Sequence, residues 1–267
     1  MSQELDSSNV DWRRRLVTAS VAIPALIAAI RCPEPVFSVI IVLAVCVGYK
    51  EISNLLKYCL HINFLLIILL YLFEIHALVV FTATVINLLV PMWSQGPLEG
   101  MKLGLVNVLY IQMFAVPMLF ASRLRNIPLH GPTLTLIWIL VSFASDAGAL
   151  AIGSKYGKHK CCPLISPNKS WEGLLGAVLG GVTVSVTLFT TRIDDTGDIS
   201  LKDFLAFGMM GSVLGMMGDL VESGLKRYVS TKDASDLLPG HGGLLDRLDS
   251  LAASAPFMYY YCEYRDW

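Results

Sequence analysis

Residues 204–221 read FLAFGMMGSVLGMMGDLV, an apolar run whose one charged side chain, Asp219, stands two residues before its end. A run of this length and composition is typical of a membrane-spanning helix, which needs about 20 mainly apolar residues. Its glycines recur every three or four positions, a spacing that favours close helix packing in lipid. A carboxylate beside hydrocarbon is costly, so the position of Asp219 favours a functional role.

The whole chain has the same membrane character. Of its 267 residues, 55% are hydrophobic and 15% are charged, and the mean hydropathy is +0.62. Soluble domains carry roughly 25% charged residues, so this composition predicts one all-α, polytopic membrane domain over residues 1–267. The net charge of −1 argues against a nucleic-acid partner that is held by bulk attraction to phosphate.

The apolar segments predict about eight or nine transmembrane helices. The candidates are 16–30, 36–49, 60–75, 76–93, 105–121, 133–152, 172–191, 204–221 and 248–262. The first two are short and could form a hairpin, which leaves the number open. We expect 1–130 to form N-terminal scaffold spans and 131–267 a C-terminal catalytic bundle, because the later spans hold the packing glycines and border the polar loops.

Lysine and arginine predict the orientation of these spans. Three arginines precede the first span, at 13–15. If they are cytoplasmic, the lysine-bearing loops near 50–57, 155–169 and 226–232 are cytoplasmic as well, as the positive-inside rule requires. Arg123 and Arg125 are the exception. The active-site loops are therefore expected on the cytoplasmic side of an integral membrane protein.

The segment Ser223–Asp249, SGLKRYVSTKDASDLLPGHGGLLDRLD, concentrates charge between two apolar runs. Asp246 and Asp249 are three residues apart and share a helical face. Carboxylates from the ends of two spans could jointly hold Mg²⁺, which takes one or two protein carboxylates and fills its shell with water and phosphates. We therefore expect Asp219, Asp246 and Asp249 to bind the metal. Glu222 and Lys226 could instead form a plain surface pair.

The turn at 239–243 predicts an anion site. Its glycines, Gly240, Gly242 and Gly243, expose backbone amides of the kind that bind phosphate. The role of His241 stays open between metal ligand, proton donor and loop-ordering hydrogen bonder. The cationic side chains expected to bind phosphate beside this turn are Lys226, Arg227, Lys232 and Arg247.

A second polar module follows Asp146, which interrupts the apolar run VSFASDAGALAIG. Its loop falls one residue short of a Walker A motif and lacks the hydroxyl residue after the lysine, so it is not a P-loop. Ser170 is placed to cap the next helix, with Glu172 in the first turn. The residues of this module that we expect to bind substrate are Asp146, Lys158, Lys160, Ser166, Lys169 and Glu172.

The fixed residues of 223–249 resemble the signature of phosphatidate cytidylyltransferases, also called CDP-diglyceride synthases. They read Ser-x-Leu-Lys-Arg, Lys-Asp, Leu-Pro-Gly-His-Gly-Gly and Asp-Arg-x-Asp in order. The resemblance is close over 146–255 and general before it. The family usually has Asp-Thr-Gly-Ala-Tyr where this chain has Asp146 to Leu150, and often lysine where it has Asn168. These changes remove a hydroxyl, a phenol and one positive charge from that module.

The resemblance implies a transfer of the cytidylyl group from CTP to phosphatidate, with CDP-diacylglycerol and pyrophosphate as products. It implies Mg²⁺ as cofactor, with a second metal ion left open, and places the enzyme among the lipids of a bacterial plasma membrane. Asp219, Asp246, Lys226, Arg227, Lys232, His241 and Arg247 would then be the catalytic set. A homodimer is an open alternative.

Two other functions compete with this interpretation. A CTP-dependent lipid-alcohol (prenol) kinase would release CDP instead of pyrophosphate and would need a base beside the acceptor hydroxyl. A transporter or non-catalytic scaffold would consume no CTP and would gather its polar residues near the middle of the bilayer.

Overall fold

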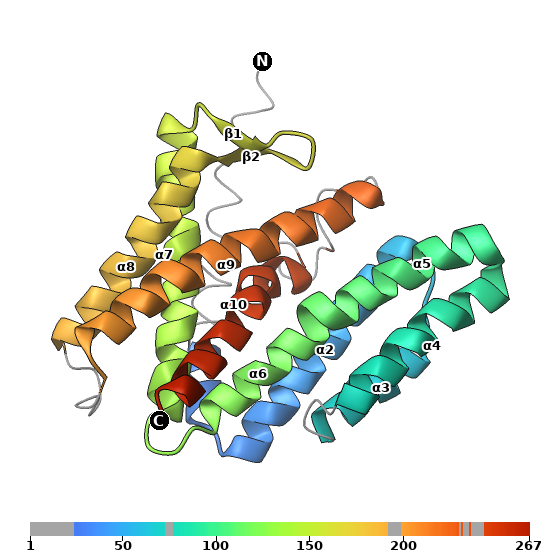
Figure 1. The fold of residues 1–267 in the computed structure, drawn as a ribbon, viewed down its shortest axis with the longest axis horizontal. Coiled ribbons are helices and arrows are strands. Elements are labelled where there is room, and N and C mark those ends of the chain that lie inside the picture. Colours follow the sequence, from blue (N-terminus) through green and yellow to red (C-terminus); the bar gives the residue numbers. More distant parts are fainter. Residues whose placement is uncertain (1–23, 73–76, 192–198, 230, 232–234, 236–242) are drawn as a thin grey trace.

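The computed structural model of the chain describes residues 24–72, 77–191, 199–229, 231, 235 and 243–267 (Figure 1). These residues form a bundle of helices with one small hairpin. After a helical segment at 24–31, the elements are α2 (Glu34–Leu56), α3 (Ile62–Leu72), α4 (Ala77–Gln95), α5 (Pro97–Tyr110), the π-helical turn η1 (Ile111–Ala115), α6 (Val116–Arg125), α7 (Gly131–Tyr156), β1 (Lys160–Cys162), β2 (Ser166–Ser170), α8 (Trp171–Thr191), α9 (Leu201–Tyr228) and α10 (Leu245–Tyr264).

Six stretches of helix among the described residues are long and apolar enough to cross a membrane. They are α2, α4, the continuous stretch from α5 to α6, α7, α8 and α9, and each overlaps a predicted span. The chain is therefore a helical integral membrane protein, as predicted. The predicted span 60–75 yields the 11-residue α3, and 248–262 lies in α10, whose charged first turn keeps it outside the six. The total of eight or nine stays a prediction.

Prolines mark where several helices begin. Pro35, Pro97 and Pro132 occupy the first or second helical position of α2, α5 and α7. A proline is tolerated there because the amide it lacks would have no partner inside the helix. Pro117, at the start of α6, directly follows the π-helical turn η1, where the missing amide interrupts the regular hydrogen bonds.

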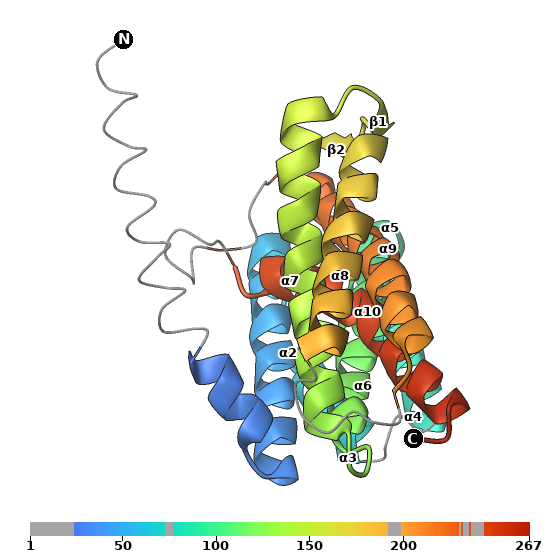
Figure 2. The ribbon, with the colours of Figure 1, turned by 90° about the vertical axis from the view of Figure 1, so that its left-hand side faces the viewer.

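The helices form two groups. In Figure 1, α7, α8, α9 and α10 lie together on one side, and α2 to α6 on the other. Contacts of α10 with α6 and of α2 with α10 join the groups, and the apolar core runs through both. Figure 2 shows the hairpin at one end of the bundle and the loop from α6 to α7 at the other. The loop that we expected in the module after Asp146 therefore contains a hairpin, which lies between the end of α7 and the start of α8.

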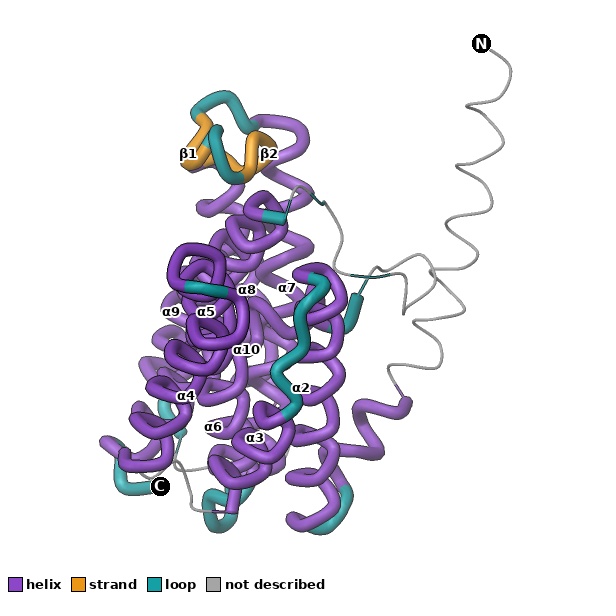
Figure 3. The backbone as a smooth tube through the Cα atoms, turned by 90° about the vertical axis from the view of Figure 1, so that its right-hand side faces the viewer, coloured by secondary structure: helices purple, strands orange, loops and turns teal. Residues whose placement is uncertain are grey.

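The hairpin is antiparallel and pairs Lys160 with Ser170 (Figure 3). Its turn is closed by the Ile165 amide, which donates to the Cys162 carbonyl over 3.1 Å. At its base the Trp171 amide donates to the His159 carbonyl over 2.9 Å. These bonds tie the hairpin to the first residue of α8, and so place the loop lysines over the end of the bundle.

Close contacts between helices occur where side chains are absent. A Cβ atom on Gly148 of α7 would lie 2.2 Å from the carbonyl oxygen of Gly176 in α8. On α9, a Cβ atom on Gly218 would lie 2.3 Å from the carbonyl oxygen of Asp249 in α10. Neither distance is compatible with a real Cβ atom, so glycine is required at both positions. The second contact brings the helix segments that carry Asp219 and Asp249 against each other.

Candidate active site

A cavity of about 600 Å³ opens at the hairpin end of the C-terminal group of helices. Residues of α7, α8, α9, α10 and the hairpin line it. The lining is Asp146, Ala149, Leu150, Gly153, Ser154, Gly157, Lys160, Asn168, Lys169, Ser170, Gly173, Met216, Asp219, Glu222, Lys226, Asp246, Arg247 and Asp249. The walls thus combine five carboxylates, several cations and an apolar side that includes Leu150 and Met216.

Three carboxylates come together on one wall of this cavity. Asp219, Glu222 and Asp249 each offer an oxygen, and these oxygens lie within 4.8 Å of one another. Asp219 and Glu222 share a face of α9, while Asp249 comes from the first turns of α10. Glu222 and Asp249 are buried, at 1% and 7% exposed. Such a group of buried acids requires positive charge nearby.

Two lysines supply part of that charge. Lys169, at the end of the hairpin, forms an ion pair with Asp219. Lys226 lies between two acids: its Nζ is 2.5 Å from Glu222 Oε2 and 2.9 Å from Asp246 Oδ1. The pair of Glu222 with Lys226 expected at i,i+4 therefore exists, but it is buried inside the cavity wall instead of exposed on the surface.

Asp246 has a different setting from the three clustered acids. Besides Lys226, it accepts a hydrogen bond from the Gly243 amide, 2.7 Å from Oδ2. Burial raises the pKa of the Asp246 carboxyl, but contacts with Glu222, Lys226 and the Gly243 amide outweigh it and hold the pKa below its ordinary value. Asp246 is therefore a fixed anion at neutral pH.

The sequence predicts Asp219, Asp246 and Asp249 as metal ligands, and the structure arranges them differently. It groups Asp219 and Asp249 with Glu222, whereas Asp246 pairs with Lys226. The physical reason is that α9 places Glu222 one turn beyond Asp219, facing α10. Asp146, predicted to bind substrate, lies on the α7 wall, where Ser250 Oγ donates to its Oδ2 over 3.4 Å.

Most of the other predicted residues that the structure describes lie in or beside the cavity. Those that line it are Asp146, Lys160, Lys169, Asp219, Lys226, Asp246, Arg247 and Asp249. Gly243 takes part through its amide. Lys232, Gly240, His241 and Gly242 lie outside the described residues, so their predicted roles stay predictions.

Besides Gly243, four predicted residues that the structure describes lie outside the cavity lining. Arg227 holds the hairpin instead, since its Nε donates to the Ile165 carbonyl over 3.2 Å. Glu172 accepts from the His159 amide and contacts His159 Nδ1 at 2.5 Å, which fixes the base of the hairpin. Lys158 is exposed and Ser166 begins β2. Ser170 caps α8 as predicted, because its Oγ accepts the Gly173 amide over 3.1 Å.

Two acids of this region were not among the predicted site residues. The i,i+4 spacing of Glu222 and Lys226 is typical of an ion pair on a helix surface, so the sequence gives no reason to expect a buried acid. Only the fold shows that Glu222 is buried. Glu51, in α2, is 5% exposed and accepts hydrogen bonds from the start of α10. Its one signal in the sequence is that it forms, with Lys50, the charged end of a long apolar run.

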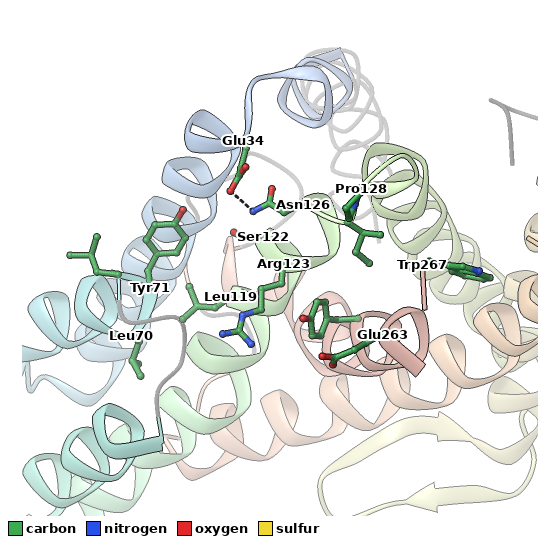
Figure 4. Close-up of a pocket in the computed structure, with 13 residues that line it drawn as sticks. Glu34, Leu70, Tyr71, Leu119, Ser122, Arg123, Asn126, Pro128, Glu263 and Trp267 are labelled. Atoms are coloured by element: carbon green, nitrogen blue, oxygen red, sulfur yellow. Dashed lines mark hydrogen bonds between the residues drawn. The ribbon is translucent and has the colours of Figure 1, made fainter. Parts of the chain in front are cut away.

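A second cavity, of about 580 Å³, lies among α2, α3, α6 and α10 (Figure 4). Figure 4 shows Glu34 joined to Asn126, a hydrogen bond of 2.6 Å, and Arg123 on the same wall. The Arg123 guanidinium stacks on Phe120, 5.6 Å from the ring centroid. Among the predicted site residues that the structure describes, none lines this cavity, so we assign it no part in the chemistry.

Comparison with known proteins identifies relatives along nearly the whole chain. The sequence profile of the cytidylyltransferase family matches residues 13–265. A phosphatidate cytidylyltransferase of Thermotoga maritima is 30% identical over 267 residues, which cover 93% of this chain and 95% of that protein. The match therefore extends through the scaffold helices as well as the C-terminal ones.

Other relatives match over a shorter region. A phosphatidate cytidylyltransferase of Haemophilus influenzae is 34% identical over 171 residues, and one of Bacillus subtilis is 39% identical over 139 residues. These matches cover 63% and 52% of this chain. They span 59% and 50% of the two relatives, so the chain spans little more than half the length of these proteins.

Proposed function

Because the chain belongs to the cytidylyltransferase family, we propose that it transfers the cytidylyl group of CTP to phosphatidate. The products are CDP-diacylglycerol and pyrophosphate. A phosphate oxygen of phosphatidate attacks the α-phosphorus of CTP, and a new oxygen–phosphorus bond forms there. The bond from the α-phosphorus to the bridging oxygen breaks, and pyrophosphate departs with that electron pair.

The observation that carries this proposal is the composition of the cavity at the hairpin end. Both anionic and cationic side chains line its walls, and its apolar side includes Leu150, which is 73% exposed. A reaction between two polyanions needs charge neutralisation and alignment more than covalent help. An amphipathic acceptor also needs an apolar approach beside the charged centre, and Leu150 and Met216 provide one.

The chain's own cations account for much of the chemistry. Lys160, Lys169 and Arg247 line the cavity, where they can bind the phosphates of CTP and of the acceptor lipid. Lys226 is held between Glu222 and Asp246, so its charge is fixed in place before any ligand arrives. Because a phosphate monoester has its second pKa near 6, the attacking oxygen is already ionised and needs no dedicated base.

We propose Asp219, Glu222 and Asp249 as the residues that hold Mg²⁺. Their oxygens lie within 4.8 Å of one another, and oxygen ligands of this kind suit that ion. When bound, the ion would neutralise charge on the phosphate oxygens. Lys169 already pairs with Asp219, so it would be available to a substrate phosphate wherever that carboxylate held the ion. Asp246 orients Lys226 in this arrangement.

The proposal includes a place in the cell. The lysines near 50–57 and at 155 and 226 lie at the ends of α2, α7 and α9, and those at 158–169 lie in or beside the hairpin, a grouping that supports the positive-inside pattern. We therefore propose that the hairpin end of the bundle faces the cytoplasm across a bacterial plasma membrane, where CTP is present. Membrane lipids reach the cavity from the leaflet on that side.

Product analysis tests the proposal. Purified protein in detergent receives CTP labelled in the cytosine, phosphatidate and Mg²⁺, and the products are separated. We expect label in the lipid fraction and one pyrophosphate for each labelled lipid. A parallel reaction receives a lipid alcohol in place of phosphatidate. Release of CDP with phosphate on that alcohol would mean a kinase, and no consumption of CTP in either reaction would mean a transporter or scaffold. Either result would overturn the assignment.

A further inference from the structure

Glu51 connects the N-terminal helices to the start of α10. It lies near the end of α2 and is 5% exposed. Its Oε1 accepts hydrogen bonds from the Leu244 amide over 2.9 Å and from Ser235 Oγ over 2.5 Å, and its Oε2 accepts one from the Leu245 amide over 2.7 Å. Figure 2 shows α2 beside the beginning of α10.

These contacts match what the start of a helix requires. The first amides of α10 have no partners inside the helix, and the helix dipole favours a negative charge there. Glu51 supplies both the acceptor oxygens and the charge, from an element almost 200 positions away in sequence. Gly48, one turn earlier in α2, lies beside Leu245, since a Cβ there would be at an ordinary contact distance of 3.8 Å from Leu245 Cδ1.

The first two turns of α10 carry two of the acids of the site. Asp246 follows Leu245 directly, and Asp249 comes one turn later. The anchoring of Leu244 and Leu245 therefore sets the position and axial rotation of the helix that brings Asp249 to Asp219 and Asp246 to Lys226. Ser235 stands between Lys226 and Asp246 in the sequence, and its hydroxyl is a further partner of Glu51.

From this geometry we propose that Glu51 is a positioning residue of the active site, acting through the first turn of α10. We call the hydrogen bonds of Glu51 to the start of α10 the tether. The expected kinetic effect rests on the proposed function, whereas the tether is a structural feature that does not. It gives the N-terminal group of helices, expected to serve as scaffold, a direct part in arranging the catalytic acids.

Asp203 provides a matched control. It is also a buried carboxylate that caps a helix, but it lies at the other end of the α9–α10 pair. It is 2% exposed and caps α9, accepting from the Ser200 amide over 2.8 Å. It also accepts from Tyr261 near the end of α10 over 2.9 Å and pairs with Arg265 at 3.0 Å. Asp203→Asn therefore removes a buried capping charge from the α9–α10 pair without touching the first turn of α10.

The experiment compares Glu51→Ala, Glu51→Gln and Asp203→Asn with the unchanged protein. Hydrogen–deuterium exchange is followed in peptides that cover 243–250, and kcat and the Mg²⁺ concentration for half-maximal rate are measured with CTP and phosphatidate. A displacement of about 1 Å costs on the order of 100-fold in rate, so we expect a loss of that size in Glu51→Ala. Glu51→Gln keeps one carbonyl acceptor, so its loss of rate should be smaller. The Mg²⁺ concentration for half-maximal rate should rise in this variant.

Two results support the proposal together: faster exchange at 243–250 in both Glu51 variants, and no such change in Asp203→Asn even where that variant melts at a lower temperature. Unchanged exchange at 243–250 in Glu51→Gln would overturn the tether. Faster exchange with wild-type kcat and Mg²⁺ requirement would overturn the positioning role. If the unchanged protein does not convert CTP and phosphatidate at all, the proposed function fails, while the exchange data still decide the tether.

Discussion

Lys226 is the side chain on which the charge balance of the cavity depends most. It is 14% exposed and contacts Glu222, 1% exposed, and Asp246, 12% exposed. Buried ions are tolerated when they are paired, and the loss of one partner leaves the other charged in a poorly solvating environment. The structural role of Lys226 is therefore inseparable from any role toward phosphate.

Replacement of Lys226 by methionine should cost stability as well as activity. The variant leaves Glu222 and Asp246 without their cation, and breaking a buried pair costs about 3–5 kcal/mol. Equilibrium unfolding in mixed detergent measures this free energy. Lys102→Met is the control, because the Lys102–Glu99 pair is exposed and such pairs contribute about 0–1 kcal/mol. Equal losses in the two variants would contradict the assignment.

The contribution of Asp246 to stability should depend on pH. Its pKa is lower in the folded protein than in the unfolded chain, so its stabilising effect is complete above the unfolded pKa, about 4. The effect is lost as the pH falls through the lower, folded value. The free energy of unfolding should therefore differ most between wild type and Asp246→Asn at pH 5–7, and the difference should shrink below pH 4. A difference that is constant or grows toward acid would refute this.

At this scale the sequence reveals the acids but not their grouping. Asp219 and Asp249 can be recognised as site residues because each stands at the edge of an apolar run. Spacing alone cannot show whether Glu222 is a site acid or part of an exposed ion pair, because a buried pair and a surface pair have the same i,i+4 spacing. Glu51 gives even less signal, because its partners are backbone amides about 190 positions away.

Among the elements, the contact of α9 with α10 decides how close Asp219 and Asp249, two of the acids proposed to bind the metal, come to each other. Gly218 precedes Asp219, and it packs against the Asp249 carbonyl. The sequence indicates close helix packing in this run, but it singles out Gly211 and Gly215 no less than Gly218. Only the crossing point of the two helices shows that Gly218 is the position where a side chain cannot fit.

Gly218→Ala should separate the two helices and reduce activity. The added Cβ would lie 2.3 Å from the Asp249 carbonyl oxygen and 2.6 Å from the Ala253 Cβ, so the backbone must move. A shift of about 1 Å between the acids should lower kcat on the order of 100-fold. Initial rates with CTP and phosphatidate measure the change.

Gly224→Ala is the matched control on the same helix. The nearest atom to its added Cβ is Ile165 Cγ2 at 3.9 Å, an ordinary contact. Alanine is the better helix former by about 1 kcal/mol, so this variant should keep its rate and its stability. If both variants kept wild-type rates, the close contact at Gly218 would have no bearing on the site.

The hairpin is the element that the sequence does not predict. The segment 157–170 contains glycine, proline and lysine in a pattern typical of a loop, and its two strands have three and five residues. The pairing depends on nonlocal bonds, such as those of Arg227 and Glu172, which no short-range pattern encodes. Its effect on the site is nonetheless direct, because it delivers Lys160 and Lys169 to the cavity.

For the whole molecule, hydropathy predicts the spans well because the bilayer imposes one length and one polarity on all of them. The six described spans all match predicted segments. What hydropathy leaves open is the status of α10, where the acids of the site occupy the first turns of the helix. Because α10 lines the cavity and carries charged residues there, its composition is less apolar than that of a typical span.

The proposed orientation predicts which cysteines reach which side of the membrane. Cys59 follows α2 at the lysine-rich end of the bundle, and Cys32 precedes α2 at the other end. In single-cysteine variants, a membrane-impermeant maleimide should label Cys32 in intact cells. It should label Cys59 only after the cells are permeabilised. The opposite pattern would place the cavity outside the cytoplasm and so contradict the proposal.

The central claim is that Asp219, Glu222 and Asp249 together hold the divalent ion with which CTP binds. Calorimetric titration of CTP with Mg²⁺ into the purified protein tests it directly, in Asp219→Asn and Asp249→Asn, with Asp203→Asn as control. Since altering even an outer-shell partner of a metal weakens affinity by about 10–100-fold, the first two variants should lose at least that much, and the control should bind as wild type. Wild-type affinity for CTP and Mg²⁺ in both cavity variants would contradict the account.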